Sequence, residues 1–234
     1  MTPRGVGLLI WAAASSAQPC PTVNDVAAER SDQARLHFLS AQLLAESHRA
    51  NTWAMAWGTT AAVLTVGQVA AVPLIIPQDR VEWWVGAATT AVGLGYVSAG
   101  SLEVMSAGPD YARRANRPTD VCALIAEGEG LLERGAARES VGNRWFNHAA
   151  NLAVNVGLGL ILGLGYGHWV AAAVNFAFGV ALGEATIFSA PSRLITAWKD
   201  YQRSELGPEN SAVSFQVFPL LSPQGAGIGL ALSF

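Results

Sequence analysis

Residues 145–191, WFNHAANLAVNVGLGLILGLGYGHWVAAAVNFAFGVALGEATIFSAP, contain no Asp, Lys or Arg and a single Glu, Glu184. The sequence Gly165-Tyr166-Gly167-His168 interrupts this segment near its middle and is typical of a tight turn. Each of the two apolar stretches that remain is about 20 residues long, the length of helix that crosses the hydrocarbon core of a bilayer. The segment therefore predicts two transmembrane helices joined by a short turn.

A weaker copy of this pattern lies earlier in the chain, in residues 53–109. Residues 51–76 and 83–102 carry no charge and are separated by a short polar turn. A tryptophan opens each copy, Trp53 in the first and Trp145 in the second, and each ends soon after a glutamate. Two such copies predict an all-α membrane fold: a four-helix transmembrane bundle built from two tandem hairpin units that run in the same sense. Two unrelated apolar hairpins would give the same architecture.

The overall composition excludes several classes of protein. Charged residues make up 13% of the chain, against roughly 25% in an average soluble domain. The 14 Lys and Arg residues form no basic stripe, which excludes nucleic acid as a partner. Four apolar segments in 234 residues leave too few polar residues to coat them, which favours membrane lipid as their surroundings. The alternative is a soluble helical bundle, because the spans are richer in Ala, Gly, Val and Thr than in Leu and Ile.

The first 17 residues have the form of a secretory signal peptide. Arg4 precedes a short apolar run, and Ser15-Ser16-Ala17 supplies small residues for cleavage. The alternative is an N-terminal helix of the mature protein. Export brings Cys20 and Cys122 into an oxidising compartment, where two cysteines and no others are expected to form one disulfide. Two unpaired thiols remain the alternative, because a sequence does not give the distance between them.

A polar amphipathic helix is expected before each apolar hairpin. The first runs from a cap at Asn24 or Asp25 to about Ala50, and the second begins after Thr119 or Asp120. In the second helix, opposite charges at three- and four-residue spacings predict a solvated face. These charges belong to Glu127, Glu129, Glu133, Arg134, Arg138 and Glu139. In the first unit, Gly108-Pro109 is expected to end the helix that follows residue 83.

The C-terminal residues change from a helical to an alternating pattern. Val213, Phe215 and Val217 alternate with polar residues, residues 222–227 are typical of a turn, and alternate positions up to Phe234 are apolar. This pattern predicts a C-terminal β-hairpin. The tail also resembles the last strand of bacterial outer-membrane barrels, which ends in an aromatic residue. Such a hairpin either packs on the helices of its own chain or pairs with hairpins of other chains, because open sheet edges are not tolerated in lipid.

The chain is thus expected to have four parts. They are the signal peptide, residues 1–17; the first amphipathic helix with its hairpin, 18–110; the second amphipathic helix with its hairpin, 111–207; and the tail, 208–234.

Small residues recur at four-residue spacing in the apolar helices and predict close helix packing. They are Gly159, Gly163 and Gly167 in one helix and Gly179 and Gly183 in its partner. Glu103 and Glu184 are the acids nearest to the apolar spans. An ionisable side chain inside a membrane is expected to serve as a proton relay or an ion contact. The competing interpretation places both glutamates at span ends, within reach of water.

No motif for chemistry is present. His148 and His168 flank the third apolar span and are expected to mark its ends, and the other histidines are too far away in sequence to complete a metal site. No cofactor motif and no arrangement of nucleophile and base occurs, so a non-enzymatic protein is predicted.

The expected function is that of a structural or scaffolding protein of the bacterial cell envelope, with its polar parts in the periplasm. Lipid and either further copies of the chain or another envelope protein are its expected partners. The inner membrane is favoured by base rate and the outer membrane is the alternative. Two other functions remain open: a small transporter or channel subunit that uses Glu103 and Glu184, and a soluble periplasmic bundle that binds an apolar ligand.

Overall fold

The computed structural model describes residues 20–21, 31–100, 102–142, 144–206, 214–222 and 225–233. The signal-peptide segment, the caps expected at Asn24 or Asp25, and Phe234 lie outside these residues. The helices are α1 (Asp32–Ala71), α2 (Arg80–Gly100), α3 (Leu102–Ala115), α4 (Val121–Gly142), α5 (Trp145–Leu160), α6 (Trp169–Phe188) and α7 (Arg193–Gln202). A π turn, Ile161–Gly165, extends α5, and 3-10 turns lie at Val72–Leu74 and Pro77–Asp79.

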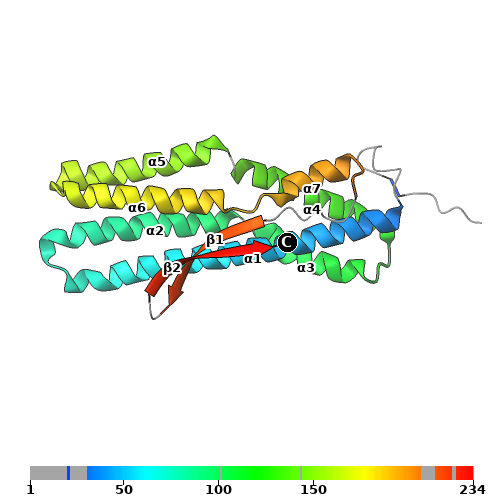
Figure 1. Cartoon of the computed structure of the whole chain (residues 1–234), viewed down its shortest axis with the longest axis horizontal. Coiled ribbons are helices and arrows are strands. Elements are labelled where there is room, and N and C mark those ends of the chain that lie inside the picture. The colour runs from blue at the N-terminus through cyan, green and yellow to red at the C-terminus, as the bar shows by residue number, and fades with distance from the viewer. Residues whose placement is uncertain are drawn as a thin grey trace, which may run out of the picture.

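The helices form an elongated body with two halves (Figure 1). The apolar half contains α1 from Asn51 onward, α2, α5 with its π turn, and α6. The polar half contains the N-terminal part of α1 together with α3, α4 and α7. Helix α1 packs against α2 in the first half and against α3, α4 and α7 in the second, while α5 packs against α6 and α4 against α7.

Helix α1 corrects the expected boundary near Ala50, because it is one continuous helix of 40 residues. Neither Gly nor Pro occurs between Asp32 and Trp57, so nothing in that stretch interrupts the hydrogen-bond ladder. The helix begins at Ser31, whose Oγ accepts a hydrogen bond from the N–H of Ala34 at 3.3 Å. A single rod therefore joins the polar half to the apolar half.

The prediction that Gly108-Pro109 ends a helix was wrong. Helix α2 ends at Gly100, and Pro109 lies inside α3. A proline there removes one backbone donor from the helix, and α3 packs closely on α1. A Cβ at Gly108 would lie 2.5 Å from the carbonyl oxygen of Leu43, so the two backbones approach as closely as glycine allows. The cap expected at Asp120 is confirmed, since its side chain accepts a hydrogen bond from the N–H of Ala123 at 3.0 Å.

Three segments of the described chain, rather than the expected four, are helical, long and apolar enough to cross a membrane. They are Asp32–Leu74, Trp145–Gly165 and Trp169–Gln202. Helix α2 is not among them, because its Thr, Ser, Gly, Trp and Tyr residues lower its mean hydropathy. The helical class is confirmed, and so is the expectation of several helices suited to a membrane.

The C-terminal segment carries strands β1 (Ser214–Ser222) and β2 (Gly225–Ser233). They pair antiparallel, with Ser214 opposite Ser233 and Ser222 opposite Gly225. Strand β1 contacts α1, and Figure 1 shows the pair lying along the outside of the helical body.

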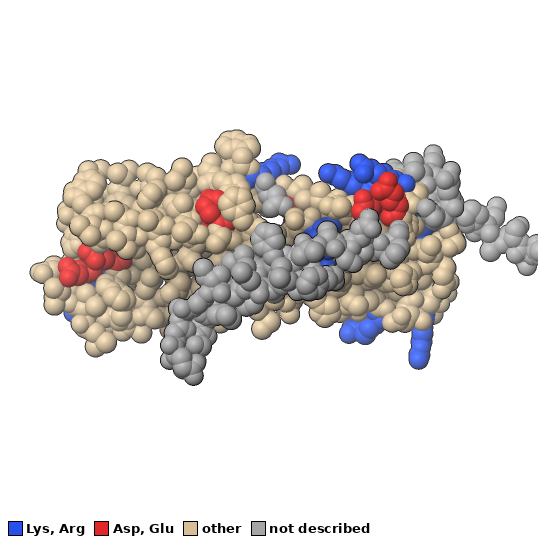
Figure 2. Space-filling view, viewed as in Figure 1, with Lys and Arg blue, Asp and Glu red and all other residues tan. Residues whose placement is uncertain are grey.

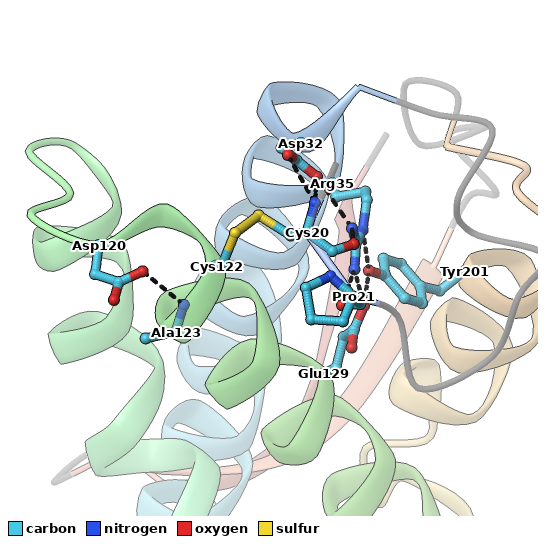
Figure 3. Close-up of a disulfide and its surroundings, with 9 residues drawn as sticks. All are labelled: Cys20, Pro21, Asp32, Arg35, Asp120, Cys122, Ala123, Glu129 and Tyr201. Atoms are coloured by element: carbon cyan, nitrogen blue, oxygen red, sulfur yellow. Dashed lines mark hydrogen bonds and ion pairs between the residues drawn. A yellow bond between two sulfur atoms is a disulfide. The ribbon is translucent and has the colours of Figure 1, made fainter. Parts of the chain in front are cut away.

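The polar half has the denser core, and the disulfide lies within it. Cys20 and Cys122 are bonded, with their Cα atoms 5.1 Å apart, as the sequence predicted (Figure 3). Around it pack the side chains of α1, α3, α4 and α7. The most deeply buried of these are Leu39, Leu43, Tyr111, Ile125, Leu132 and Leu194.

A buried ion pair beside the disulfide corrects the expectation that Glu129 lies on a solvated face. Glu129 is 1% exposed, and its Oε1 lies 2.7 Å from Nη2 of the fully buried Arg35 (Figure 3). Tyr201 accepts a hydrogen bond from Nε of Arg35 at 3.1 Å and donates its own hydroxyl to Glu129. Both partners bond Oε1 of Glu129, and these hydrogen bonds tie α1, α4 and α7 together.

Large hydrophobic side chains are exposed over the surface of the apolar half. The most exposed include Leu74 at 86%, Val170 at 81%, Trp145 and Phe188 at 77%, and Leu164 at 72%. On the face shown in Figure 2, acidic atoms appear at the tip of this half and near its boundary with the polar half, and the area between is uncharged.

Candidate functional site

A ladder of asparagine side chains runs along the interface between α5 and α6. Asn151 and Asn155 are four residues apart on α5, so they lie on one face of that helix. Nδ2 of Asn155 donates to both the carbonyl oxygen and the Oδ1 of Asn151, each at 2.9 Å. Nδ2 of Asn151 donates in turn to the carbonyl oxygen of Val180 at 3.2 Å and to Oε1 of Glu184 at 2.9 Å. The amides therefore cross-link the two apolar helices.

Two of the glycines singled out from the sequence provide the space for this ladder. A Cβ at Gly179 would lie 1.9 Å from Oδ1 of Asn155, and one at Gly183 would lie 2.1 Å from Oδ1 of Asn151. At either distance a Cβ would force the facing asparagine side chain to move. These glycines therefore make room for an amide side chain of the partner helix as well as for the backbone of that helix.

The other three glycines have separate surroundings. A Cβ at Gly159 would make ordinary contact with the carbonyl oxygen of Ala172 at 3.6 Å. A Cβ at Gly163 would lie 2.6 Å from the ring of Trp169, so the indole packs directly on the backbone there. Gly167 has a φ of +74° and forms the turn between the two helices, a conformation that favours glycine.

The ladder ends at the boundary between the two halves, on the pair formed by Glu184 and His148. Nδ1 of His148 lies 2.5 Å from Oε2 of Glu184, and both side chains are about a third exposed, at 32% and 27%. A continuous hydrogen-bonded chain thus runs from the accessible imidazole through Glu184 and Asn151 to Asn155, which is 4% exposed.

A cavity of about 230 Å³ lies beside the inner end of this chain, between α1, α2, α5 and α6. The walls are mostly apolar, with Leu64, Phe178 and Leu182 among them. Their polar members are hydroxyls and amides: Thr60, Gln68, Thr89, Thr90, Tyr96, Asn147, Asn151, Asn155, Asn175 and Thr186. None of the described residues that line the cavity is acidic or basic.

The amide of Asn155 lies at the wall of this cavity. Its nitrogen faces two acceptors on Asn151, which determines the orientation of the amide group. Its Oδ1 lies against the backbone of Gly179 on α6. Asn155 is therefore a nearly buried side chain that fills the space left by the glycine.

Glu103 and Glu184, the two acids singled out from the sequence, have different surroundings. Glu103 is an exposed residue of α3, and its Oε1 lies 3.0 Å from Nη2 of Arg134, so it belongs to the surface of the polar half. Glu184 contacts His148 and Asn151. The described contacts give the two glutamates no common partner.

Two further clusters were not found from the sequence. Asp79, Glu82 and His168 meet at the tip of the apolar half, where ligand atoms of the three lie within 4.8 Å of one another and Nδ1 of His168 contacts Glu82. A hydrogen bond between the imidazole and the carboxylate accounts for that contact.

The second cluster pairs Glu46 of α1 with Glu139 of α4, at the N-terminus of α7. Glu46 is 1% exposed, and Oε2 of Glu139 accepts a hydrogen bond from the N–H of Ile195 at 3.3 Å. Burial, together with the neighbouring Glu46 carboxylate, raises the pKa of Glu139 to about 9. This corrects the expectation that Glu139 lies on a solvated face.

The asparagine ladder has a signal in the sequence. Asn147, Asn151 and Asn155 recur every fourth residue within a span that is otherwise apolar. That spacing places three amides on one helix face, and an amide inside an apolar helix needs a hydrogen-bond partner on a neighbour.

The observations define a class: a helical protein with three candidate membrane-spanning helices, a disulfide in its polar half and a cavity in its apolar half. Comparison of the chain with protein-family models, with curated proteins and with solved structures found no match.

Proposed function

We propose that the protein is a non-enzymatic integral membrane protein of the bacterial cell envelope, with its apolar half in the lipid bilayer and its polar half in the periplasm. The observation that supports this proposal best is the distribution of exposed hydrophobic side chains. They cover the half in which residues 50–78, 83–102 and 145–183 contain no Asp, Glu, Lys or Arg. In water, a surface of this extent would drive association.

The length of the apolar half fits a bilayer. The part of α1 from Asn51 to Ala71 is helical, and 21 residues at a rise of 1.5 Å each span about 30 Å, the thickness of a hydrocarbon core. In this proposal α2 crosses the membrane with the other three helices. Its hydroxyl side chains Thr89 and Thr90 line the cavity rather than the lipid, so its lower mean hydropathy is compatible with a buried position.

The disulfide supports the periplasmic location of the polar half, because a bond between Cys20 and Cys122 persists in an oxidising compartment. The signal-peptide form of residues 1–17 supports the same side. The two turns at the tip of the apolar half, near residues 77–79 and 166–168, would then face the other side.

Fractionation of bacterial cells tests the membrane location. We expect the protein to stay in the membrane pellet through carbonate extraction and to be released by detergent. A Val174→Arg substitution, at a side chain of α6 that is 62% exposed, places a charge toward lipid and is expected to lower the inserted fraction.

The matched control is Val141→Arg, at a side chain of α4 that is 53% exposed in the polar half, and it should leave insertion unchanged. A wild-type protein that is monodisperse in plain buffer, with both arginine variants behaving alike, would contradict the membrane location and favour a soluble bundle.

A second candidate function is transport of a small solute, and the chain from His148 to the cavity favours it. The test is flux through proteoliposomes that contain the wild-type protein, the Glu184→Gln variant or the Glu103→Gln variant. Transport that uses the cavity predicts loss of flux for Glu184→Gln alone, because Glu103 lies in an exposed ion pair. Equal flux through all three would remove this candidate and leave the structural function.

A further inference from the structure

We propose that Asp79, Glu82 and His168 form a binding site for a zinc ion at the tip of the apolar half. The bound ion would join the turn between α1 and α2 to the turn between α5 and α6. This inference goes beyond the proposed function. It does not rest on the membrane location, because the three ligands come from the two turns and not from the surface that would face lipid.

Two turns of the chain bring the three side chains together. Asp79 ends the 3-10 turn before α2, Glu82 lies in the first turn of α2, and His168 precedes α6. One ligand atom from each of the three lies within 4.8 Å of the other two. Ligands of one zinc ion lie at most about 4.4 Å apart, since each is about 2.0–2.2 Å from the metal. Side-chain shifts of about 1 Å would therefore place all three atoms around one ion.

The three side chains face one another at a tip whose other residues are mostly exposed. Asp79 is the only half-buried residue in the stretch 76–80, and His168 is the only one in the stretch 164–170. Acidic atoms are visible at this end of the molecule in Figure 2. The hydrogen bond of His168 uses the carboxylate of Glu82 alone. Asp79 brings a second carboxylate to the same place, which that hydrogen bond does not require and a metal ion does.

The backbone holds His168 in place without a metal. Its N–H donates to the carbonyl oxygen of Leu162 at 3.0 Å, and its own carbonyl oxygen accepts from the N–H of Ala172 at 2.8 Å. The side chains of Leu162 and Ala172 form a buried cluster with Val85 of α2, and Val81 packs against this cluster. The start of α2 is thereby held beside the turn between α5 and α6, so the ligand positions are preorganised.

The types of ligand select the metal. Zinc accepts imidazole nitrogen and carboxylate oxygen, and three protein ligands leave its fourth tetrahedral position to water. The two carboxylates supply the negative charge that balances a divalent cation. Magnesium and calcium prefer oxygen ligands alone, so the imidazole disfavours them.

The test is equilibrium dialysis of the full chain in detergent micelles against zinc, after a chelator has removed bound metal. No reductant is added, because Cys20, Asp32 and Cys122 also lie within 4.8 Å of one another, and the thiolates released from the disulfide would bind zinc. We expect the wild-type chain to retain one zinc ion. Magnesium at the same concentration should not displace it, and cobalt, which accepts the same ligands, should compete.

Substitution of the ligands separates coordination from the hydrogen bond. His168→Ala, Glu82→Gln and Asp79→Asn should each lower the zinc affinity at least about 100-fold, because loss of an outer-shell partner alone costs about 10–100-fold. Asp79→Asn is the decisive variant, since the hydrogen bond of His168 does not involve Asp79. The matched control is His148→Ala, which removes the imidazole of the other His–Glu pair. No third ligand joins that pair among the described residues, so the zinc affinity should stay unchanged.

Thermal unfolding gives a second measurement. Zinc at a concentration 100-fold above its Kd should raise the Tm of the wild type by roughly 5–10 °C and leave that of Asp79→Asn nearly unchanged. A wild-type chain that retains no zinc, or binds it no more tightly than Asp79→Asn, would overturn the site. Loss of affinity in His148→Ala would place the ion elsewhere, and displacement by magnesium would overturn the assignment of zinc. Cell fractionation tests the membrane location separately, so failure of one proposal leaves the other intact.

Discussion

Glu139 is expected to make the protein less stable as the pH rises from 5 to 8. It lies beside Glu46 in the interior of the junction between the two halves, and burial followed by the Glu46 carboxylate raises its pKa from 4.5 to about 9. A carboxyl whose pKa is raised on folding binds more protons in the folded state than in the unfolded state. Its contribution to stability is therefore complete below pH 4.5 and is lost as the pH rises through about 9.

The magnitude follows from the width of that interval. Each pH unit between the two pKa values costs up to about 1.36 kcal/mol for one proton, so the three units from pH 5 to pH 8 set an upper limit of about 4 kcal/mol. We expect about half of this. Nη1 of Arg49 lies 3.3 Å from Oε2 of Glu46, and the N–H of Ile195 donates to Glu139, so positive charge and a donor offset part of the repulsion.

The assay is thermal unfolding of the full chain in detergent micelles at several pH values. A loss of about 2 kcal/mol corresponds to a fall in Tm of roughly 4–8 °C for a chain of this size. Glu139→Gln replaces the carboxyl with a neutral side chain of the same shape and should remove most of this fall. Glu133→Gln, at an exposed position of the same helix, is the matched control and should follow the wild type. Parallel pH profiles for wild type and Glu139→Gln would refute the reasoning.

Three further predictions concern stability. Replacing both cysteines with Ser opens a loop with a sequence separation of 102, which should lower the free energy of unfolding by about 4.7 kcal/mol on the chain-entropy model, measured by chemical unfolding of oxidised and variant protein. Arg35→Ala leaves Glu129 buried without its cation and should cost about 3–5 kcal/mol, whereas Arg113→Ala, at a side chain that is 75% exposed, should cost about 0–1 kcal/mol; equal costs would contradict the assigned burial. Gly183→Ala places a Cβ 2.1 Å from Oδ1 of Asn151 and should lower the Tm, and Gly157→Ala, whose Cβ meets nothing within 4 Å, should not.

Local features of the sequence predicted much of the helical framework. The long uncharged stretches identified α5 and α6, Gly167 marked the turn between them, and Asp120 marked the start of α4. These features are local, because helix caps, turns and membrane-length apolar runs depend on residues that are close together in the chain.

The candidate site was predicted only in part. The sequence pointed to Glu184 and the two glycines of α6 but not to the asparagines that contact them. The role of an amide in an apolar span depends on which residue of the neighbouring helix it faces. The acidic residues of α4 show in the same way that the sequence does not reveal which side chains are buried. Glu127 forms an exposed pair with Arg114 that lowers the pKa of the Glu127 carboxyl, as expected for a solvated face, whereas Glu129, two residues further on, is buried against Arg35.

The sequence alone determined that this chain forms long apolar helices suited to a membrane and that its two cysteines are available to each other, since hydropathy and cysteine count are properties of the chain itself. Only the tertiary structure decided which charged groups are buried and which apolar residues stay exposed. Helix α1 aligns Glu46 with Glu139, and the pairing of α5 with α6 sets Asn155 opposite Gly179 at the edge of a cavity. These contacts join residues that are far apart in the chain. They depend on how whole helices are placed relative to one another, and no local sequence pattern encodes that placement.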